Sequence, residues 1–427
     1  MTGTRRPRRI ASIDRPWTVQ KSLVLATPLA VKPVDEIRAV LTEHARRHPG
    51  SPITSRLDPA SCRWLPVPLG EWEAHLDRMV VTAADPDPGD LDGHISAHVV
   101  VPADLPLVVV VSPTSMLAQT NHAVGDAITL TQLVVALSRA DQAQLDAVEQ
   151  RARTAEPVWA LLRGLRPHHR DWAQYVRHRT APPTPSATGP AVTLRPSFAG
   201  SVLSNTALRD ITRWRNANAR GVSLTSVLTS LAHQAFLRRD MPVHDQGFYT
   251  LLDLRPLLPA STGPRWGNLS KSLYLTADLT DPRAVEVALK AARKTRRALP
   301  ATVVAAATGA VSRPRPPDAT SPTTTPMVLT FNSIPTLPGL SELPWNETGQ
   351  RRYYGFGPAV GSGGITVFAI RLREHMELTA SFDETAVSAD TVREALEAMS
   401  DPAVLLTGLA TTPAPPATKP QQASDPR

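Results

Sequence analysis

The stretch Gln119 to Ala127, QTNHAVGDA, decides how the rest of the chain is interpreted. It stands at the end of LPLVVVVSPTSMLAQTNH (105–122), which predicts two strands joined by a Ser-Pro turn, the first of them central in a sheet. It is followed by AITLTQLVVALSRA (127–140), which predicts a helix. The stretch therefore connects a strand to a helix, where binding and catalytic side chains are often found.

His122 and Asp126 are the two residues of this stretch that could support chemistry, and Gly125 allows a tight turn between them. A neutral imidazole near pH 7 is the usual general base for an alcohol or an amine. A structural histidine, hydrogen-bonded at the end of a strand, is the alternative. His122 alone among the twelve histidines has an aspartate four residues later. Such a pair is frequent by chance, so the pattern alone does not decide between a catalytic and a structural role of His122.

The composition indicates a cytoplasmic globular protein. Cys62 is the single cysteine, which excludes an internal disulfide and agrees with a reducing compartment. The basic N-terminus leads into no apolar signal region, and no apolar run is long enough to span a bilayer. The net charge of +8 favours anionic partners without choosing among them.

The chain of 427 residues exceeds the size at which single hydrophobic cores usually stop growing, so we expect two domains. We place a flexible arm at 1–14 and an N-terminal lobe with the His122 motif at 15–178. A Pro-rich linker at 179–198 follows. The C-terminal lobe takes 199–410, and the composition of 411–427 predicts a disordered tail.

Both predicted lobes mix helices and strands, which makes the fold class α+β. The helices are expected at 33–50, 127–140, 223–239, 281–299 and 388–399. The strands are expected at 17–32, 105–122, 247–256 and 326–335, with a hairpin at 365–383.

A basic helix face is the second candidate site, and it is formed by Lys290, Arg293, Lys294 and Arg297. It is either a solvated surface or a docking site for a phosphate-bearing partner. Nucleic acid is not expected, because no recognised binding motif accompanies the charge. The sequence also lacks a Walker A loop, a strand-linked G-x-G-x-x-G, a G-x-S-x-G elbow and a metal-ligand cluster, so we expect no metal site.

The segment NHAVGDA resembles the H-H-x-x-x-D-G motif of the condensation-domain superfamily. That group includes condensation domains of peptide synthetases, polyketide-associated and BAHD-type acyltransferases and, more distantly, chloramphenicol acetyltransferase. Other segments resemble elements of this family in the same order, from about residue 17 to 400. They are the first helix (33–50), the helix that opens the second half (221–239), Asp253 and Arg255 in LLDLRPLLP, Gly267 and Asn268 in RWGNLSKSLYL, Asn332 in VLTFNSIP, and the closing strands (353–383).

This resemblance implies two chloramphenicol-acetyltransferase-like lobes in a V with a central substrate tunnel. It implies that His122 is the base or positioning group for a hydroxyl or amine that attacks a thioester carbonyl. Asp126 would pair with an arginine and hold the loop, with Arg255 as the candidate partner. Asn332 and Asn268 would act on the substrate or transition-state side.

Two positions depart from the family motif. Asn121 replaces the first histidine, and its side chain can still form hydrogen bonds. Ala127 replaces the final glycine, which matters only if that residue needs a positive φ. The D-F-G-W-G motif of the BAHD-type enzymes is also absent.

The resemblance predicts a free-standing acyltransferase of specialised (nonribosomal peptide or polyketide) metabolism. It would transfer an acyl group from a CoA or carrier-protein thioester to an alcohol or amine. Coenzyme A or an acyl or peptidyl carrier protein would arrive in trans, as would a small-molecule acceptor, and no cofactor would be bound permanently. The alternatives are cyclisation or dehydration of a tethered intermediate, and a non-catalytic module that recruits a carrier protein.

Overall fold

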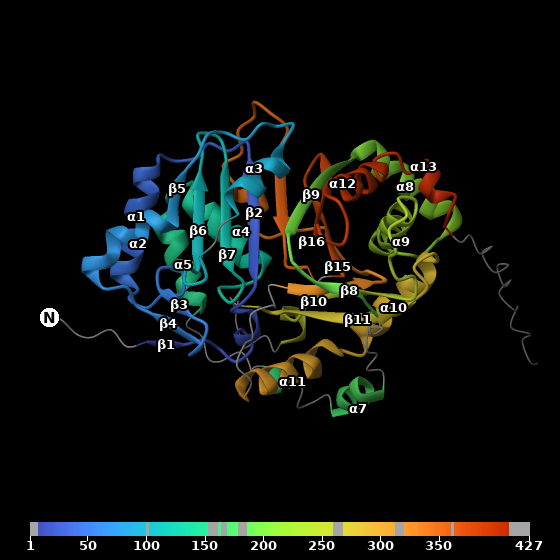
Figure 1. Ribbon diagram of the computed structural model, residues 1–427, viewed down its shortest axis with the longest axis horizontal. Coiled ribbons are helices and arrows are strands. Elements are labelled where there is room, and N and C mark those ends of the chain that lie inside the picture. Colours follow the sequence, from blue (N-terminus) through green and yellow to red (C-terminus); the bar gives the residue numbers. More distant parts are fainter. Residues whose placement is uncertain are drawn as a thin grey trace, which may run out of the picture.

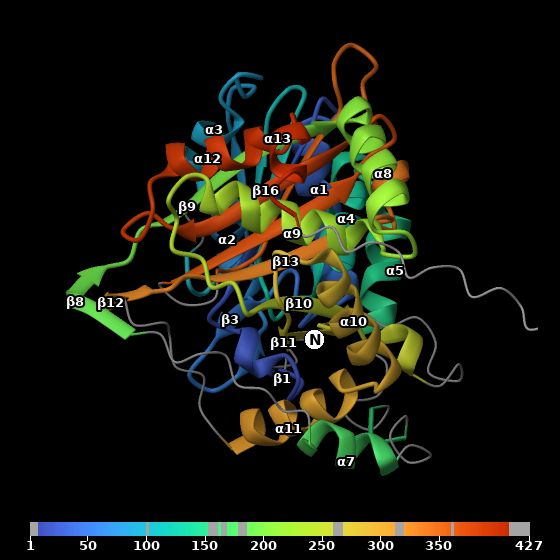
Figure 2. The same cartoon turned by 90° about the vertical axis from the view of Figure 1, so that its right-hand side faces the viewer.

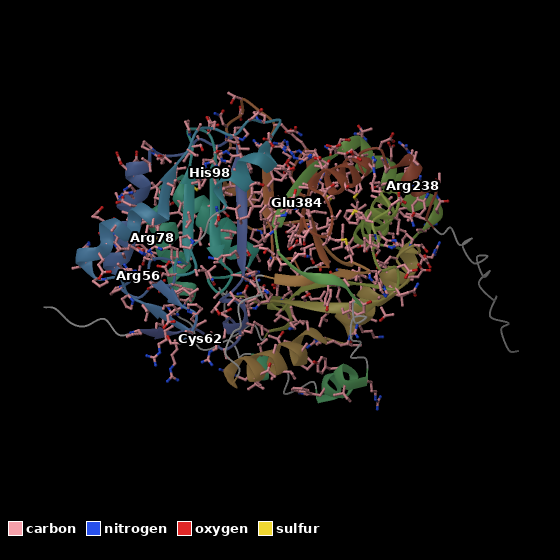
Figure 3. All side chains as sticks on the ribbon, viewed as in Figure 1. Arg56, Cys62, Arg78, His98, Arg238 and Glu384 are labelled. Carbon is pink, nitrogen blue, oxygen red and sulfur yellow. The ribbon has the colours of Figure 1, made fainter. Side chains whose placement is uncertain are left out.

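The computed structural model describes residues 7–99, 102–152, 161–163, 169–177, 186–258, 268–311, 320–359 and 363–409. Two halves lie side by side, and each is built on its own sheet (Figure 1). The fold class is mixed α and β, as predicted. Exposed charged side chains such as Arg78 and Arg238 occur on both halves (Figure 3). No helix within the described residues is long and apolar enough to cross a membrane.

The first half contains a five-stranded sheet in the order β14-β2-β7-β6-β5. Its centre is the predicted hairpin, in which β6 (Leu107–Val111) pairs antiparallel with β7 (Met116–Asn121). Every residue of both strands is buried, which agrees with their apolar sequence. The neighbouring strands are β2 (Lys21–Thr27) and β5 (Val80–Thr82).

Helices cover both faces of this sheet. The core on one face lies beneath α1 (Val34–Arg47), α2 (Trp72–Met79), α4 (Ala127–Ser138) and α5 (Gln142–Ala152). On the other face, α3 (Leu91–His98) packs on a smaller apolar cluster. A separate small sheet consists of β1 (Arg8–Arg9), β3 (Arg56–Asp58) and β4 (Arg63–Leu65).

The second half contains a six-stranded sheet in the order β11-β10-β13-β15-β16-β9. Its strands are β9 (Pro196–Ser204), β10 (Gly247–Asp253), β11 (Ser270–Thr276), β13 (Val328–Ile334), β15 (Gly364–Arg371) and β16 (His375–Asp383). The last two form the predicted antiparallel hairpin.

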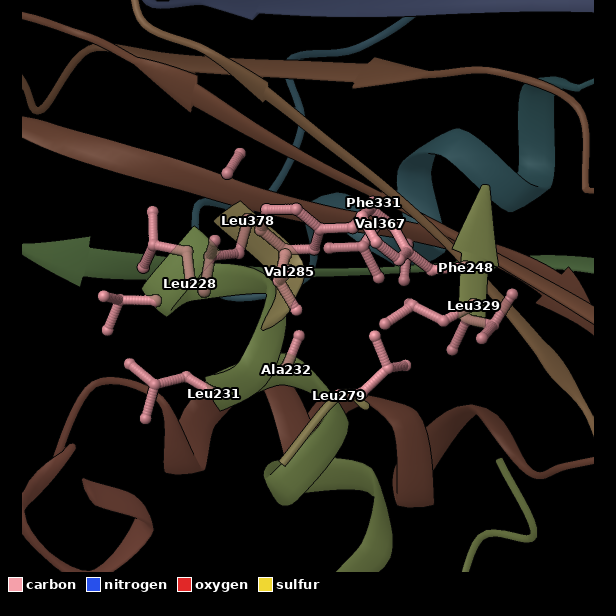
Figure 4. Close-up of a cluster of buried hydrophobic side chains, with 14 of the residues drawn as sticks. Leu228, Leu231, Ala232, Phe248, Leu279, Val285, Leu329, Phe331, Val367 and Leu378 are labelled. Carbon is pink, nitrogen blue, oxygen red and sulfur yellow. The ribbon is translucent and has the colours of Figure 1, made fainter. Parts of the chain in front are cut away.

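The helices of this half are gathered over one face of its sheet, as the side view shows (Figure 2). They are α8 (Asn205–Asn218), α9 (Leu224–Leu237), α10 (Pro282–Lys294), α12 (Ala389–Ala398) and α13 (Ala403–Leu406). Between helices and strands lies an apolar core that includes Leu228, Val285, Phe331 and Val367 (Figure 4). Ser223 and Ser388 accept hydrogen bonds at the first turns of α9 and α12, which explains where these helices begin. Two further helices, α7 (His169–Arg177) and α11 (Ala298–Val311), lie at the lower edge of Figure 1.

One strand crosses between the halves. β14 (Arg352–Phe356) lies between β13 and β15 in the sequence, yet it pairs antiparallel with β2 at the edge of the first sheet. The predicted C-terminal lobe at 199–410 therefore contributes a strand to the other half. This crossing brings residues 353–357 close to the motif at 119–127.

The predicted boundaries need three corrections. The arm at 1–14 is wrong for its described part, because β1 pairs with β4, and Ile10 and Ile13 are buried. The linker at 179–198 contains β8 (Ser186–Thr193), which pairs with β12 (Thr320–Thr325), and the start of β9. The helix expected at 281–299 is two helices, because Arg296 has a φ of 48° between α10 and α11. The tail 411–427 lies outside the described residues.

Candidate active site

A cavity of about 270 Å³ lies between the two halves, and His122 lines it. Its walls come from β2 and α4 of the first half, from β10, β13 and β15 of the second, and from the crossing strand β14. Since each half supplies one side, the motif at 119–127 faces the second half across this space. The cavity lies between the two halves, where the resemblance predicts a substrate tunnel, and the tunnel itself stays a prediction.

His122 follows β7, and its backbone N–H donates to the carbonyl of Gln20 at 2.8 Å. Its ring lies 4.5 Å from the ring of Trp17, centroid to centroid. Burial lowers the pKa of His122 below its ordinary value of 6.5. Nδ1 is buried and makes no hydrogen bond of ordinary geometry within the described part of the chain. Because the side chain is partly exposed and lines the cavity, we infer that Nε2 faces it.

Asp126 lies at the start of α4 and forms an ion pair across the two halves. Its Oδ2 is 2.8 Å from a terminal guanidinium nitrogen of Arg255, just after β10. The side chains of Asp126 and Arg255 are 8% and 23% exposed, so the pair is largely removed from solvent. Arg255 also contacts Asp253 at 3.1 Å. The pair connects the motif loop to the second sheet.

Asn121 is fully buried and holds the loop that contains His122. Its side-chain amide donates to the carbonyl of Thr18 at 2.7 Å, and its side-chain oxygen accepts from the N–H of Ala123 at 3.0 Å. Both ends of the amide are therefore used. Asparagine can fill this position of the motif, because the role there is structural.

Gly125 and Ala127 differ in what the backbone requires. Ala127 is the first residue of α4 and has no positive φ, so a glycine is not needed there. Gly125, which was expected to allow a tight turn, also has no positive φ, so backbone conformation does not require glycine there. A Cβ at Gly125 would instead lie 2.4–2.6 Å from the side-chain atoms of Thr129. The close approach of α4 excludes a side chain.

Replacement of Gly125 by alanine is therefore expected to lower the free energy of unfolding by about 1–3 kcal/mol, as overpacking of a tight site does. Urea denaturation checks this value. The matched control is Gly70→Ala, because a Cβ at Gly70 meets no atom within 4 Å. Equal effects of the two substitutions would contradict the packing argument.

Asn268 requires a correction, because it does not line the cavity. Its side-chain Nδ2 donates to the backbone carbonyl of His122 at 2.5 Å and to Asp14 at 3.2 Å. The prediction that Asn268 acts on the substrate is wrong, because its amide binds the backbone carbonyl of His122 and does not line the cavity. Asp14, 8% exposed, was missed because it stands in the segment predicted as a flexible arm. Gly267, its predicted neighbour, lies outside the described residues.

Asn332 lines the cavity from β13. Its side-chain oxygen accepts a hydrogen bond from the N–H of Leu251 at 2.7 Å, which fixes the orientation of the amide. Its Nδ2 is buried and donates to none of the described residues. A fixed donor without a partner is therefore present on the wall formed by the second half.

The basic helix face divides into residues with different surroundings. Arg293 is exposed, lines the cavity and forms no ion pair with the described residues. Lys290 pairs with Glu286 at 3.1 Å, and Lys294 is exposed outside the cavity. Arg297 is partly buried, and burial lowers its pKa. Of the four predicted residues, only Arg293 belongs to the cavity.

A cluster that the sequence analysis did not predict lies on the first half, between α1 and α5. His44, His48 and Asp146 bring three potential metal-ligand atoms within 4.8 Å of one another. Asp146 accepts hydrogen bonds from His48 at 2.9 Å and from Gln142 at 2.8 Å, and it pairs with Arg47. Through these contacts the carboxylate of Asp146 connects α5 to the end of α1. None of the residues lines the cavity.

No protein-family model and no curated protein sequence matches this chain. Solved structures match over nearly its whole length. The first condensation domain of the calcium-dependent antibiotic synthetase, in complex with substrate analogue 3a, has 13% identity and a TM-score of 0.57, with 96% of this chain and 100% of that chain covered.

Two other matches have similar scores. TRI101 of F. sporotrichioides, complexed with coenzyme A and T-2, has 13% identity and a TM-score of 0.56, with 92% and 97% covered. The nonribosomal peptide synthetase FmoA3 has 16% identity and a TM-score of 0.56, with 95% of this chain and 45% of that chain covered. At this identity the likeness establishes the fold. The chain has the fold that these solved structures share.

Proposed function

We propose that the protein is an acyltransferase that moves an acyl group from a thioester to an alcohol or amine. The observation that supports this most is the position of His122, whose accessible nitrogen faces a cavity lined by both halves. The Asp126–Arg255 pair and the Asn121 and Asn268 contacts hold the backbone on either side of this histidine. The solved structures of the same fold include a condensation domain with a substrate analogue and TRI101 with coenzyme A.

In the proposed reaction, the oxygen or nitrogen of the acceptor attacks the carbonyl carbon of the thioester. Nε2 of His122 accepts the proton that this oxygen or nitrogen loses. The carbonyl electron pair moves to oxygen and gives a tetrahedral oxyanion. Nδ2 of Asn332 is the candidate donor to this oxyanion, because the amide is held in one orientation and this buried nitrogen has no hydrogen-bond partner among the described residues. When the carbonyl forms again, the C–S bond breaks and the thiolate takes the proton from His122. The products are an ester or amide and a free thiol.

The lowered pKa of His122 predicts the pH dependence of the reaction. A general base works in its neutral form, and burial keeps that form present at pH values below the ordinary 6.5. As the pH falls, kcat/KM is therefore expected to decline with a midpoint below pH 6.5. A pH–rate profile with thiol release as readout measures the midpoint. A midpoint at or above 6.5 would contradict the burial argument.

The donor is proposed to carry phosphate, either as coenzyme A or as a phosphopantetheinyl carrier protein. Arg293 lines the cavity, is exposed and forms no ion pair with the described residues, so it is the proposed contact for an anionic group of the donor. Arg293→Glu is expected to raise KM for acyl-CoA about fivefold at low salt, with a smaller change in kcat. The matched control is Lys294→Glu, which reverses a charge on the same helix outside the cavity. Equal effects of both changes would indicate a general effect of net charge.

The proposed function is tested by incubation of the purified protein with acyl-CoA and acyl-carrier thioesters and a panel of alcohols and amines. Mass spectrometry is expected to detect an acceptor that has gained the acyl group. A carrier protein that binds while no donor is consumed would favour a recruitment module. A product with the mass of the donor acyl group less water, or in cyclised form, would favour altered chemistry on a tethered intermediate.

A further inference from the structure

The cavity is lined by two chemically different sets of side chains, one charged and one apolar, and we call the part that each set lines its charged end and its apolar end. Its charged side chains are Asp126, Asp253, Arg255 and Arg293, which come from the start of α4, the end of β10 and α10. The remaining wall is formed largely by apolar side chains from α4, β13, β14 and β15. Leu130, Ile334, Leu337, Phe368 and Ile370 belong to this wall.

The crossing strand β14 shapes the apolar end. Tyr353 and Gly355 lie opposite Ala26 and Val24 of β2 and, as residues two apart on a strand, lie on one face of the sheet. Gly357, the next alternate residue, also lines the cavity. The hydroxyl of Tyr353 is 2.6 Å from that of Thr131, so its hydrogen bond is made within the protein. This strand therefore offers the cavity an aromatic ring followed by two positions without side chains.

Both glycines stand close to the apolar side chains of β15. A Cβ at Gly355 would lie 2.9 Å from Cδ1 of Ile370, and a Cβ at Gly357 would lie 3.1 Å from Cζ of Phe368. Neither glycine has a positive φ, so backbone conformation does not require glycine there. A methyl group at either position would take up space at the apolar end.

The size of the cavity limits what it can hold. A cavity of about 150 Å³ lined by apolar side chains accepts benzene. The cavity here is about 270 Å³. That volume, which counts the charged and the apolar part of the cavity together, is enough for one aromatic ring or a fused pair.

We propose that the apolar end of the cavity binds an uncharged apolar group of one to two rings, and that Gly355 and Gly357 set its upper size. The group belongs to the acyl donor or to the acceptor, and this inference rests on the proposed acyl transfer at His122. The charged end stays free for the polar part of the same substrate. A charged group at the apolar end would lose its hydration without gaining a partner.

The test combines binding with turnover. Benzyl alcohol and 2-naphthylmethanol are the probes, and their binding to the full chain is measured by ligand-observed NMR. Gly355→Ala and Gly357→Ala are each expected to weaken binding of the naphthyl probe roughly tenfold, because a single methyl group in an apolar pocket has an effect of this size. Binding of the benzyl probe should change less than about threefold. Phe368→Leu, which enlarges the pocket, should change the preference in the opposite direction.

The matched control is Val367→Ala, because Val367 neighbours Phe368 on β15 but is buried in the core on the other face of the sheet. It is expected to lower stability and to leave the size preference unchanged. Equal weakening of both probes by the glycine substitutions, or no weakening of either, would overturn the proposal. The proposal would also be overturned if Val367→Ala altered the size preference as much as the glycine substitutions do.

Turnover then identifies the source of the group. Benzoyl-CoA and 2-naphthoyl-CoA are compared with one acceptor, and the two alcohols are compared with acetyl-CoA. If Gly355→Ala changes the rate ratio between the two CoA thioesters, the pocket binds the acyl group. If it changes the rate ratio between the two alcohols, the pocket binds the acceptor. If the probes bind with the expected size preference and no donor is consumed, the pocket stands and the proposed acyl transfer fails.

Discussion

Replacement of His122 by alanine is expected to lower kcat/KM for acyl transfer by roughly 10²–10⁴-fold, the usual contribution of a general base. The substitution removes the accessible ring nitrogen from the cavity and leaves the neighbouring backbone contacts in place, since Gln20 and Asn268 bind the main chain of His122. Thiol release from the donor measures the rate. Thermal unfolding of the variant, compared with wild type, shows that the loss is chemical.

His98→Ala is the matched control for this experiment. His98 is the last residue of α3 (Figure 3). It is not among the residues that line the cavity. Its replacement is expected to leave kcat/KM within about twofold of wild type, as for a residue that makes no contact with substrate. A His122→Ala variant with full activity would show that His122 is the structural histidine considered at the start.

Replacement of Arg255 by alanine is expected to destabilise the protein by roughly 3 kcal/mol, because it leaves Asp126 buried without its cation. Asp126 is 8% exposed, and its other carboxylate oxygen has no hydrogen bond within the described residues. Activity is expected to fall as well, since the pair positions the loop that contains His122. Denaturation by urea and thiol release measure the two effects.

The double variant Arg255→Ala/Asp126→Asn separates the lost ion pair from the lost packing. It removes the unpaired charge, so part of the stability is expected to return. The control is Arg239→Ala, which breaks an exposed pair with Glu394 at 2.7 Å and is expected to cost less than about 1 kcal/mol. If the two arginine variants were equally stable, the pair with Asp126 would be no more than a surface contact.

Local patterns predicted most of the elements that position the site. The run at 105–122 predicted β6 and β7, because an apolar strand followed by a Ser-Pro turn has few other outcomes. The helices expected at 223–239 and 388–399 correspond to α9 and α12, whose first turns are capped by the hydroxyls of Ser223 and Ser388. β14 was outside such reasoning. Its sequence RYYGF suits a strand in either half, and only long-range pairing places it beside β2.

The site itself was predicted through the family resemblance and corrected by geometry. Arg255 stands far from Asp126 in the sequence, and no local spacing indicates that the two meet. Asn268 was predicted to act on the substrate, because a sequence motif identifies a residue and does not show where its side chain points. The buried Asp14 was missed since the basic composition around it is typical of an unstructured arm. The apolar end of the cavity was not predictable, because its side chains come from several elements that lie far apart in the sequence.

The central claim is that the acyl group is transferred from the donor to the acceptor beside His122, in the cavity between the two halves. The most direct measurement is a crystal structure of the protein with a non-hydrolysable thioester analogue and an acceptor. The account predicts the analogue's carbonyl in the cavity and the acceptor oxygen or nitrogen within about 3 Å of Nε2 of His122. Density for the analogue outside the cavity, or a ring of His122 turned away from both ligands, would contradict it.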